Sequence, residues 1–344
     1  MERKLATIRI IDKIEPINGA DNIEVATIDG WEVVVKKDEF NVGSPCIYIE
    51  IDSWVPTEIA PFLSKGKNIK TYNSIPGERL KTARLRGQLS QGLVLNYWDY
   101  PSVVEEFHKT RLSSDGYFDV TSLLNIQKWE APIAANLDGV VKGNFPSYIP
   151  KTDQERVQNM TKTFSNLETN LRWEVSEKLD GSSMTVYLKD NEFGVCSRNL
   201  DLKIDENNTF CKISIANNIE EFLRSKGGNY AIQGEIIGEG IQKNPYGLKG
   251  QNFYVFDVYN IDRMVYLNSF DRMEFINGML NHVPIVNSLT YIEYDSKVLL
   301  EKSEIKSILN PKVNVEGLVY KCFEKPYISF KAISNSWLLK NEGK

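Results

Sequence analysis

The stretch EVSEKLDGSSMTVYL, from Glu174 to Leu188, places a lysine and an aspartate two positions apart between two apolar segments. Lys178 precedes the tetrad DGSS, whose residues are typical of a turn between two strands. Residues 136–139, NLDG, repeat the Leu-Asp-Gly part with an asparagine in place of the lysine. A turn alone would accept either version, so the lysine at position 178 favours chemistry over turn geometry.

Further charged residues interrupt apolar runs in the second half of the chain. Arg198 follows a predicted strand in CSRN, and Glu235 ends the apolar run in IQGEIIG. Glu316 precedes a strand in VEGLVYK, and Lys331 lies inside one in ISFKAIS. A charge in an apolar strand is costly unless it is paired or functional. We therefore expect these residues to converge on one site.

The pattern of elements predicts two domains of different class. Residues 1–125 are mostly short strands separated by turn residues and one long basic loop, which predicts a small closed barrel of OB type. Residues 126–152 contain three prolines and little periodicity, so we predict a linker. Residues 153–344 mix strands with helices around 217–226, 269–282 and 296–308. Because strands and helices do not alternate regularly, we predict an α+β domain with antiparallel sheets.

Composition excludes several classes of protein. The chain has 344 residues, a net charge of −5, and enough length for two cores. No apolar run reaches the roughly 18 residues of a membrane-spanning helix, so we expect no membrane partner. The four cysteines are scattered and there are two histidines, which argues against a zinc site, a histidine-rich metal site and a disulfide framework. We expect a reducing, intracellular location, the cytoplasm, and chemistry based on Lys, Arg, Asp and Glu.

Basic residues are concentrated in one segment of the predicted barrel. Between Ser64 and Arg86, seven basic residues stand against one acid, Glu78. Such a segment is either a solvated loop surface or a contact for nucleic-acid phosphates. The candidate contacts are Lys65, Lys67, Lys70, Arg84 and Arg86.

Taken in order, the charged residues and the segment FYVFDVY resemble the signatures of the covalent nucleotidyltransferase superfamily of ATP-dependent ligases and capping enzymes. The resemblance covers residues 156 to 331 and includes five signatures in the family's order. It implies that Lys178 attacks the α-phosphate of ATP to form lysyl-AMP. It also implies that Arg198 and Glu235 bind the ribose, that Phe256 stacks on the base and that Glu177 contacts the adenine edge. Lys331 would contact the α-phosphate, and Arg156 would approach the nucleotide. Asp180 and Glu316 would bind metal and its waters.

These residue types fit the implied chemistry. A free lysine with a pKa near ~10.4 is only about 0.04% neutral at pH 7, a penalty of roughly 4.6 kcal/mol for nucleophilic attack. A divalent cation held by carboxylates beside the amine would depress the pKa of Lys178, and a second would neutralise the departing pyrophosphate. We therefore expect ATP and Mg²⁺ or Mn²⁺, with two metal ions in the adenylylation step. Asp180 should then belong to a metal shell rather than form a tight salt bridge with the lysine.

Structural interpretations of the same residues stay open. Lys178 and Asp180 could form an ion pair at a strand end, although the ordered set of signatures favours function. Phe256 could be a core residue, and Arg156 could be a solvated helix arginine.

One position departs from the family pattern. The last signature usually has two lysines flanking one residue, but here the first of them is Ser329. A direct lysine contact at that position is therefore in doubt, and Lys321 or Lys325 could substitute.

Domain order narrows the resemblance. DNA ligases and mRNA capping enzymes carry an OB domain after the last lysine signature, whereas few residues follow Lys331 here. The segments PINGADNIEVATIDGW, FNVGSPCIYIEIDSWVP and LKTARLRGQLSQGLVL resemble the N-terminal OB domain of ATP-dependent RNA ligases related to RNA ligase 2. This resemblance implies an enzyme of RNA repair that seals 3′-OH and 5′-phosphate RNA ends through lysyl-AMP and RNA-adenylate. Its partners would be RNA ends, in nicked duplex or broken RNA, with no obligate protein partner.

Two alternatives remain. A guanylyltransferase would use the same lysine with GTP. A nucleic-acid-binding protein whose second domain has lost catalysis would keep the barrel, and Ser329 leaves that interpretation open.

Overall fold

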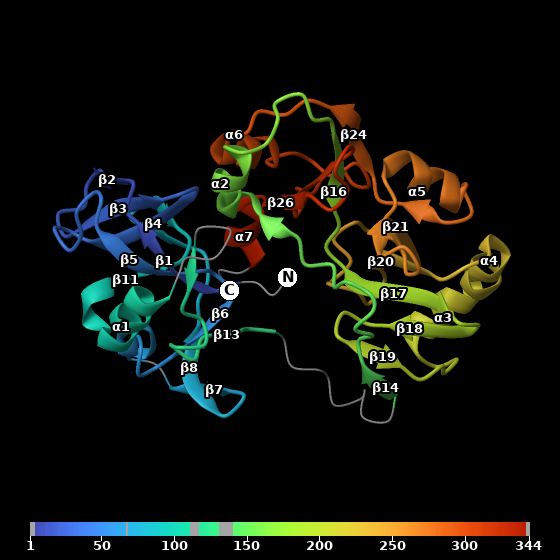
Figure 1. Ribbon diagram of the computed structural model, residues 1–344, viewed down its shortest axis with the longest axis horizontal. Helices are drawn as coiled ribbons and strands as arrows, with labels where there is room; N and C mark the ends of the chain where they lie inside the picture. The colour runs from blue at the N-terminus through green and yellow to red at the C-terminus, as the bar shows by residue number, and fades with distance from the viewer. Residues whose placement is uncertain (1–3, 67, 111–116, 131–139, 342–344) are drawn as a thin grey trace.

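Alternating apolar residues in the first part of the chain form short antiparallel strands. In β4 (Trp31–Lys36) the side chains of Trp31, Val33 and Val35 are buried, as expected for a strand with one face on a core. The computed structural model describes residues 4–66, 68–110, 117–130 and 140–341. Figure 1 shows the N-terminal lobe, in blue and cyan, beside a C-terminal lobe that runs from green to red.

The N-terminal lobe consists of small sheets packed around shared apolar cores. The strand orders are β11-β5-β1-β12, β2-β3-β4, β13-β6-β8-β7 and β10-β9. The bounds are β1 (Ala6–Ile10), β2 (Lys13–Pro16), β3 (Ile23–Ile28), β5 (Pro45–Ile49), β6 (Ser53–Pro56), β7 (Lys70–Tyr72), β8 (Ile75–Arg79), β9 (Ala83–Leu85), β10 (Gln88–Ser90), β11 (Leu93–Asn96), β12 (Phe118–Asp119) and β13 (Gln127–Lys128), with helix α1 at Pro101–Lys109.

The C-terminal lobe contains two sheets whose strands are mostly antiparallel. The larger has the order β14-β19-β18-β17-β20-β21-β22 with β23 beside β21, and the smaller has the order β15-β26-β25-β16-β24. The larger-sheet strands are β14 (Val141–Asn144), β17 (Ser182–Lys189), β18 (Glu192–Cys196), β19 (Leu200–Leu202), β20 (Tyr230–Gly238), β21 (Gln251–Asn260), β22 (Val265–Tyr266) and β23 (Asn281–His282). The smaller-sheet strands are β15 (Glu155–Arg156), β16 (Trp173–Lys178), β24 (Ile285–Thr290), β25 (Gly317–Cys322) and β26 (Ser329–Ile333).

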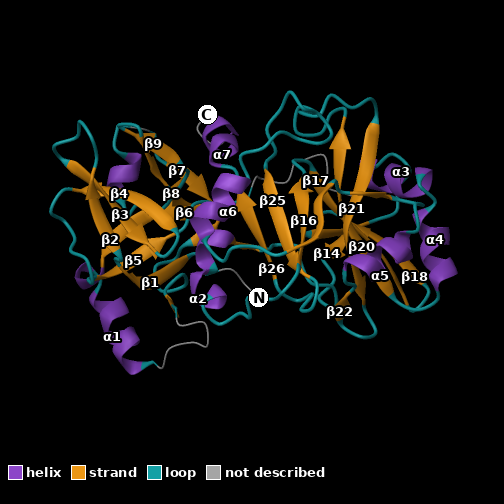
Figure 2. Cartoon of the chain, turned by 90° about the horizontal axis from the view of Figure 1, so that it is seen from above, coloured by secondary structure: helices purple, strands orange, loops and turns teal. Residues whose placement is uncertain are grey.

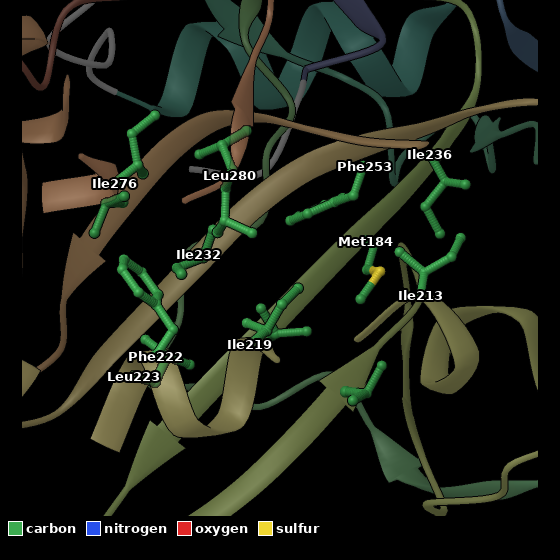
Figure 3. Packing of buried hydrophobic residues seen from close by; sticks show 14 of the residues in the cluster. Met184, Ile213, Ile219, Phe222, Leu223, Ile232, Ile236, Phe253, Ile276 and Leu280 are labelled. Atoms are coloured by element: carbon green, nitrogen blue, oxygen red, sulfur yellow. The ribbon is translucent and has the colours of Figure 1, made fainter. Parts of the chain in front are cut away.

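Helices cover one face of the larger sheet and thereby orient the other face toward the site. Ile232 and Ile236 of β20 belong to the same buried apolar cluster as Phe222 and Leu223 of α4 (Ile219–Lys226) (Figure 3). Burying each such side chain contributes roughly 1.5–3 kcal/mol. Because side chains alternate along a strand, Glu235 lies on the opposite face from Ile232 and Ile236. The helices of this lobe are α2 (Thr161–Phe164), α3 (Thr209–Ala216), α4 (Ile219–Lys226), α5 (Ser269–Ile276), α6 (Ser296–Lys302) and α7 (Asn335–Asn341).

The amide side chain of Asn159 forms hydrogen bonds to residues of both lobes. Asn159 Oδ1 accepts hydrogen bonds from Arg9 Nη2 at 3.0 Å and Trp31 Nε1 at 2.8 Å. Its Nδ2 donates to Glu50 Oε1 at 2.5 Å and to Glu155 Oε1 at 2.9 Å. The amide thus uses both of its donors and both acceptor positions, which holds the lobes in one orientation.

The last helix of the chain also packs on the N-terminal lobe. α7 follows β26 directly, and its Leu338 is 1% exposed in the same apolar cluster as Ile28 and Trp31. Seen from above, α2, α6 and α7 lie between the two lobes (Figure 2). In the described part of the chain, none of the helices is long and apolar enough to cross a membrane.

Several predicted elements differ from the observed ones. The stretch 126–152, predicted as a linker, contributes β13 to the N-terminal lobe and β14 to the larger sheet of the C-terminal lobe. Its residues 131–139, including NLDG, lie outside the described residues. The helix expected over 269–282 ends at Ile276, because Asn277 takes a left-handed conformation with a φ of 41° and Gly278 follows it.

The buried position of Leu338 predicts a loss of stability when its side chain is truncated. Leu338→Ala should lower the free energy of unfolding by about 2–5 kcal/mol, because it leaves a cavity between the lobes. Urea denaturation followed by tryptophan fluorescence measures this change. The control is Leu123→Ala, since Leu123 is 47% exposed and its loss should cost less than about 0.5 kcal/mol. Equal effects of the two substitutions would contradict the prediction.

Candidate active site

A cavity of about 830 Å³ lies where the two sheets of the C-terminal lobe meet the N-terminal lobe. Its walls include Asp52 and Arg79 from the N-terminal lobe. All of the nucleotide and metal candidates from the sequence line it, namely Arg156, Glu177, Lys178, Asp180, Arg198, Glu235, Phe256, Glu316 and Lys331. The predicted candidates therefore share one cavity, although the first and the last of them, Arg156 and Lys331, are 175 positions apart in sequence.

Close packing of strands positions the lysine. Lys178 ends β16 and pairs with Gly317 of β25, which places it beside Glu316. A Cβ on Gly317 would lie 2.3 Å from the Ala332 carbonyl oxygen, and one on Gly181 would lie 2.3 Å from that of Ile236. Both glycines are therefore needed for close backbone approach, which adds to the turn function expected for the tetrad.

The lysine forms an ion pair with a carboxylate other than its neighbour in sequence. Lys178 Nζ lies 2.7 Å from Glu316 Oε1, and the lysine side chain is 27% exposed. Burial by itself would lower the pKa of the amine, but attraction by Glu316, Glu235 and Asp180 outweighs it, and the net pKa is raised. In this state the amine is protonated and therefore not nucleophilic. No Lys178–Asp180 salt bridge is present among the described residues.

The carboxylates around Lys178 are crowded by one another. Burial and the nearby Glu316 raise the pKa of Asp180 to about 7. Burial, opposed by Lys178 and reinforced by Glu316 and Asp180, raises the pKa of Glu235 to about 8. One ammonium group therefore does not neutralise the cluster. Oxygen ligands with uncompensated negative charge are the chemistry that Mg²⁺ and Mn²⁺ prefer. Among the described residues no group of three Asp, Glu, His or Cys side chains is arranged to hold a metal ion, so the carboxylates fit a cation that keeps much of its water shell.

The part of the cavity around Glu177 and Phe256 has an apolar wall and one carboxylate oxygen without a hydrogen bond among the described residues. Glu177 is 1% exposed, and its Oε2 accepts a hydrogen bond from the backbone N–H of Ile308 at 3.0 Å. Its Oε1 is buried without a hydrogen-bond partner among the described residues. Burial raises the pKa of this carboxyl, while bonds from Ser307 and Ile308 partly offset that effect. Phe256 packs nearby in an apolar cluster with Val283.

Cations from several elements meet at Asp153. Its carboxylate lies 2.9 Å from Lys331 Nζ, 2.5 Å from Lys128 Nζ and 3.8 Å from Arg198 Nη2. Although burial opposes it, attraction by Lys331 and Lys128 holds the pKa of Asp153 well below its usual range.

The guanidinium of Arg156 is only partly satisfied. It is 5% exposed, and its Nη2 pairs with Asp52 of the N-terminal lobe at 3.0 Å. Its Nε and Nη1 are buried without hydrogen-bond partners among the described residues. Arg156 is thus a buried residue of β15 rather than a solvated helix arginine.

Among the described residues, the basic candidates of the N-terminal lobe lie outside the cavity. Lys65 is exposed, and Lys67 lies outside the described residues. Lys70 is exposed and pairs with Glu78 at 2.6 Å. Arg84 and Arg86 are exposed on the β9–β10 hairpin, where Arg84 Nη1 donates to the Gly87 carbonyl oxygen.

Comparison with known proteins identifies the family. Models of an OB-fold domain and of an RNA ligase match residues 5–97 and 171–333. A ligand-free mutant of Naegleria gruberi RNA ligase is 42% identical to the chain, with 99% of each chain covered and a TM-score of 0.90. The chain belongs to the RNA ligase family. The predicted N-terminal OB fold and the ligase domain are thereby confirmed.

Further solved structures of the same Naegleria gruberi enzyme are similar to this RNA ligase over its full length. A mutant with ATP and Mn is 43% identical, covers 99% of this chain and 100% of its own, and gives a TM-score of 0.89. The enzyme with PPi is also 43% identical, with 100% of both chains covered and a TM-score of 0.89. No curated protein sequence matches the chain at a significant level.

Some residues of the cavity of this RNA ligase were not predicted from the sequence. Lys128 and Asp153 line it, but both fall at the edges of the predicted linker, where no pattern marks them. Gln242 and Lys243 also line it, from a loop in which three consecutive residues, 242 to 244, have positive φ values between 43° and 60°. Positive φ at non-glycine residues is often found at functional sites.

The raised pKa of Asp180 predicts that this carboxylate destabilises the metal-free protein. The pKa in the folded protein is about 7, above the usual ~3.9, so the folded state binds a proton more tightly and stability falls as pH rises toward 8. Asp180→Asn should therefore raise the free energy of unfolding at pH 8 by on the order of 1–3 kcal/mol, and by less at pH 5.

Urea denaturation in the presence of a chelator, at both pH values, measures the effect. The control is Asp21→Asn at an exposed position, which should change stability little at either pH. A loss of stability in Asp180→Asn at pH 8 would be incompatible with the proposed crowding of charge.

Proposed function

We propose that this protein is an ATP-dependent RNA ligase that seals 3′-OH and 5′-phosphate RNA ends through lysyl-AMP and RNA-adenylate intermediates in RNA repair. The observation that carries the proposal is the position of Lys178. Its amine lies among Asp180, Glu235 and Glu316 in a cavity that also holds Phe256 and the other nucleotide candidates. A lysine in such a setting is suited to attack a phosphate once its proton is lost.

Recognition of the base would favour ATP over GTP. The free, buried Oε1 of Glu177 is a hydrogen-bond acceptor, which matches the exocyclic amino group of adenine. Guanine presents a carbonyl oxygen at the equivalent position, and two acceptors would then face each other without a shared proton. Phe256 would stack on the base. These features support adenylylation over the alternative guanylyltransferase activity.

Charged residues of the cavity would hold the sugar and phosphates. We assign Arg198 and Glu235 to the ribose and Lys331 to the α-phosphate. The buried, unpartnered Nε and Nη1 of Arg156 suit an anion close to the nucleotide. Asp153, which pairs with Lys331 and Arg198, would keep these cations in place before the nucleotide binds.

Asp180 and Glu316 would hold Mg²⁺ or Mn²⁺. The solved Naegleria gruberi mutant with ATP and Mn supports the use of both by this chain. When bound, the cation supplies positive charge that lowers the pKa of the nearby amine, and we propose a second cation on the leaving group. Glu316 would then exchange its direct ion pair with Lys178 for the metal.

Adenylylation replaces one bond of the α-phosphorus of ATP with a bond to Lys178. The Lys178 ammonium first gives a proton to water, and the neutral Nζ attacks the α-phosphorus of ATP. The nitrogen gives a second proton to water as its bond to phosphorus forms. The bond from that phosphorus to the bridging oxygen of the β-phosphate breaks, and pyrophosphate leaves. The AMP group would then pass to the 5′-phosphate of an RNA end, and attack by a 3′-OH would release AMP and join the strands.

Transfer of label from α-phosphate-labelled ATP to the protein tests the proposal. In the presence of Mg²⁺ or Mn²⁺ the wild-type protein should become labelled in an acid-labile form. Lys178→Ala should lose the label entirely, because Lys178 carries the amine that lies among Asp180, Glu235 and Glu316. Lys189→Ala, at the end of β17, is the matched control and should label normally. Label from GTP instead would support guanylyltransferase activity, and label from neither would favour a binding protein without catalysis.

RNA would contact the basic surface of the OB domain, with Lys65, Lys67, Lys70, Arg84 and Arg86 as the proposed residues. Arg84 and Arg86 are the sharpest test, because both are exposed on one hairpin outside the cavity. Either nicked duplex or broken single strands could be the substrate class, and both place phosphates within reach of such a surface.

Removing the two hairpin charges should weaken RNA binding and leave adenylylation intact. Arg84→Ala with Arg86→Ala should reduce affinity for nicked RNA several-fold and reduce the slope of log affinity against log salt by up to about 2. Fluorescence anisotropy at several salt concentrations measures both. Lys13→Ala with Lys109→Ala removes the same charge elsewhere on the lobe and should have little effect. An unchanged salt slope in the hairpin variant would remove Arg84 and Arg86 from the proposed contact.

A further inference from the structure

A buried network of charged side chains lies beside Phe256 and Val283, at the end of the cavity where we propose that the base binds. It joins the two sheets of the C-terminal lobe. It combines two acids with two bases, so its formal charges cancel, and one histidine completes it. Its members are Glu174 of β16, Asp257 of β21, Arg272 of α5, His282 of β23 and Lys321 of β25. Charges this deeply buried are retained only where partners satisfy them.

One half of the network is centred on Arg272, which is 1% exposed. Its Nη2 donates to both carboxylate oxygens of Glu174, and its Nε donates to His282 Nε2 at 3.0 Å. Because a guanidinium only donates, His282 Nε2 accepts and its Nδ1 carries the proton. Nδ1–H then donates to the Val283 carbonyl oxygen at 2.7 Å. Val283 lines the cavity, so this half of the network fixes one piece of its apolar wall.

The other half is centred on Lys321, whose side chain is 9% exposed. Its ammonium lies 2.6 Å from Asp257 Oδ1 and donates to the carbonyl oxygen of Phe256. The same ammonium lies 5.6 Å from the centroid of the Phe256 ring, within the range of a cation–π contact. Lys321 therefore contacts both the backbone and the ring of the residue that forms the second piece of the wall.

The position of Lys321 on its strand bears on the missing lysine of the last signature. Lys321 lies directly opposite Ser329 in the pairing of β25 with β26. Its ammonium is nevertheless held by Asp257 and the Phe256 carbonyl, on the base side of the cavity. Lys325, the other possible substitute, pairs with Glu168 and does not line the cavity. Neither lysine, as placed here, replaces the absent phosphate contact.

We propose that Lys321 is a positioning residue for the nucleotide base, acting by fixing the backbone and ring of Phe256. The proposal rests on the stacking function proposed for Phe256. Held by Asp257, the ammonium keeps the Phe256 carbonyl from turning and the ring from leaving the cavity wall. Lys321 then affects how tightly ATP binds rather than how fast the bound ATP reacts.

A double-mutant cycle between Lys321 and Phe256 tests this inference. The measurement is the rate of lysyl-AMP formation against ATP concentration, which separates the apparent affinity for ATP from the limiting rate. Lys321→Met and Phe256→Ala should each weaken the affinity about tenfold or more, as expected when stacking is lost, and change the limiting rate less than about twofold. The double variant should bind ATP no more weakly than Phe256→Ala, because Lys321 acts through the ring.

The controls separate the possible failures. Lys325→Met removes an exposed lysine of the same segment and should leave both quantities unchanged. Lys321→Met with Asp257→Asn removes both charges of the pair, so no uncompensated buried charge remains if the single variant does not fold. This double replacement should also weaken ATP affinity and not the limiting rate.

Each other outcome has a distinct meaning. If Phe256→Ala leaves ATP affinity unchanged, the proposed stacking function is wrong. If Phe256→Ala weakens affinity but the Lys321 variants do not, the inference about Lys321 is overturned while the proposed function stands. If the effects of Lys321→Met and Phe256→Ala are additive, or if Lys321→Met lowers mainly the limiting rate, Lys321 acts on the phosphates and not on the base.

Discussion

Antiparallel pairing of β16 with β25 is the interaction on which the site depends. It sets Lys178 opposite Gly317, and so beside Glu316, although the lysine and the glutamate are far apart in sequence. Gly317 also lets β25 approach β26 closely on its other side, because a Cβ there would lie 2.3 Å from the Ala332 carbonyl oxygen. The larger sheet then supplies Glu235 and Phe256 from the face that its helices leave uncovered. The cavity is thus a product of two sheets, neither of which contains the whole site.

The same arrangement shows a conflict between stability and chemistry. Burial, together with repulsion among three carboxylates around one amine, raises the pKa of Asp180 and Glu235, so uncompensated charge destabilises the ligand-free site. The network beside Phe256 differs in this respect, because its two acids and two bases neutralise one another within the protein. These residues are Glu174, Asp257, Arg272 and Lys321. The carboxylates around Lys178, which we propose bind a cation, thus carry excess negative charge. The buried network that supports the cavity wall is neutral.

Much of this organisation could be predicted from the sequence because its signals are local. Strands such as β3 and β4 follow from alternating apolar residues, and the order of the charged signatures led to the residues that share the cavity. What could not be predicted are contacts that depend on register and on loops. The ion pair between Lys178 and Glu316 is one case, because it depends on the register of β16 with β25. The clamp at Asn159 is another, because a polar residue in a short turn carries no periodic signal.

The hydrogen bonds of Asn159 and the burial of Leu338 in the N-terminal lobe affect the folding of the molecule. Ile333 and Leu338 belong to an apolar cluster whose other residues come from the N-terminal lobe, so part of one hydrophobic core is assembled from both ends of the chain. Unfolding either lobe would expose apolar surface of the other, which couples the stability of the two lobes. A fragment cut between them would carry an open hydrophobic face and a buried arginine, Arg9 or Arg156, without its partner across the interface. The stability of each domain of this ligase therefore depends on the other, although the two domains are largely separate in sequence.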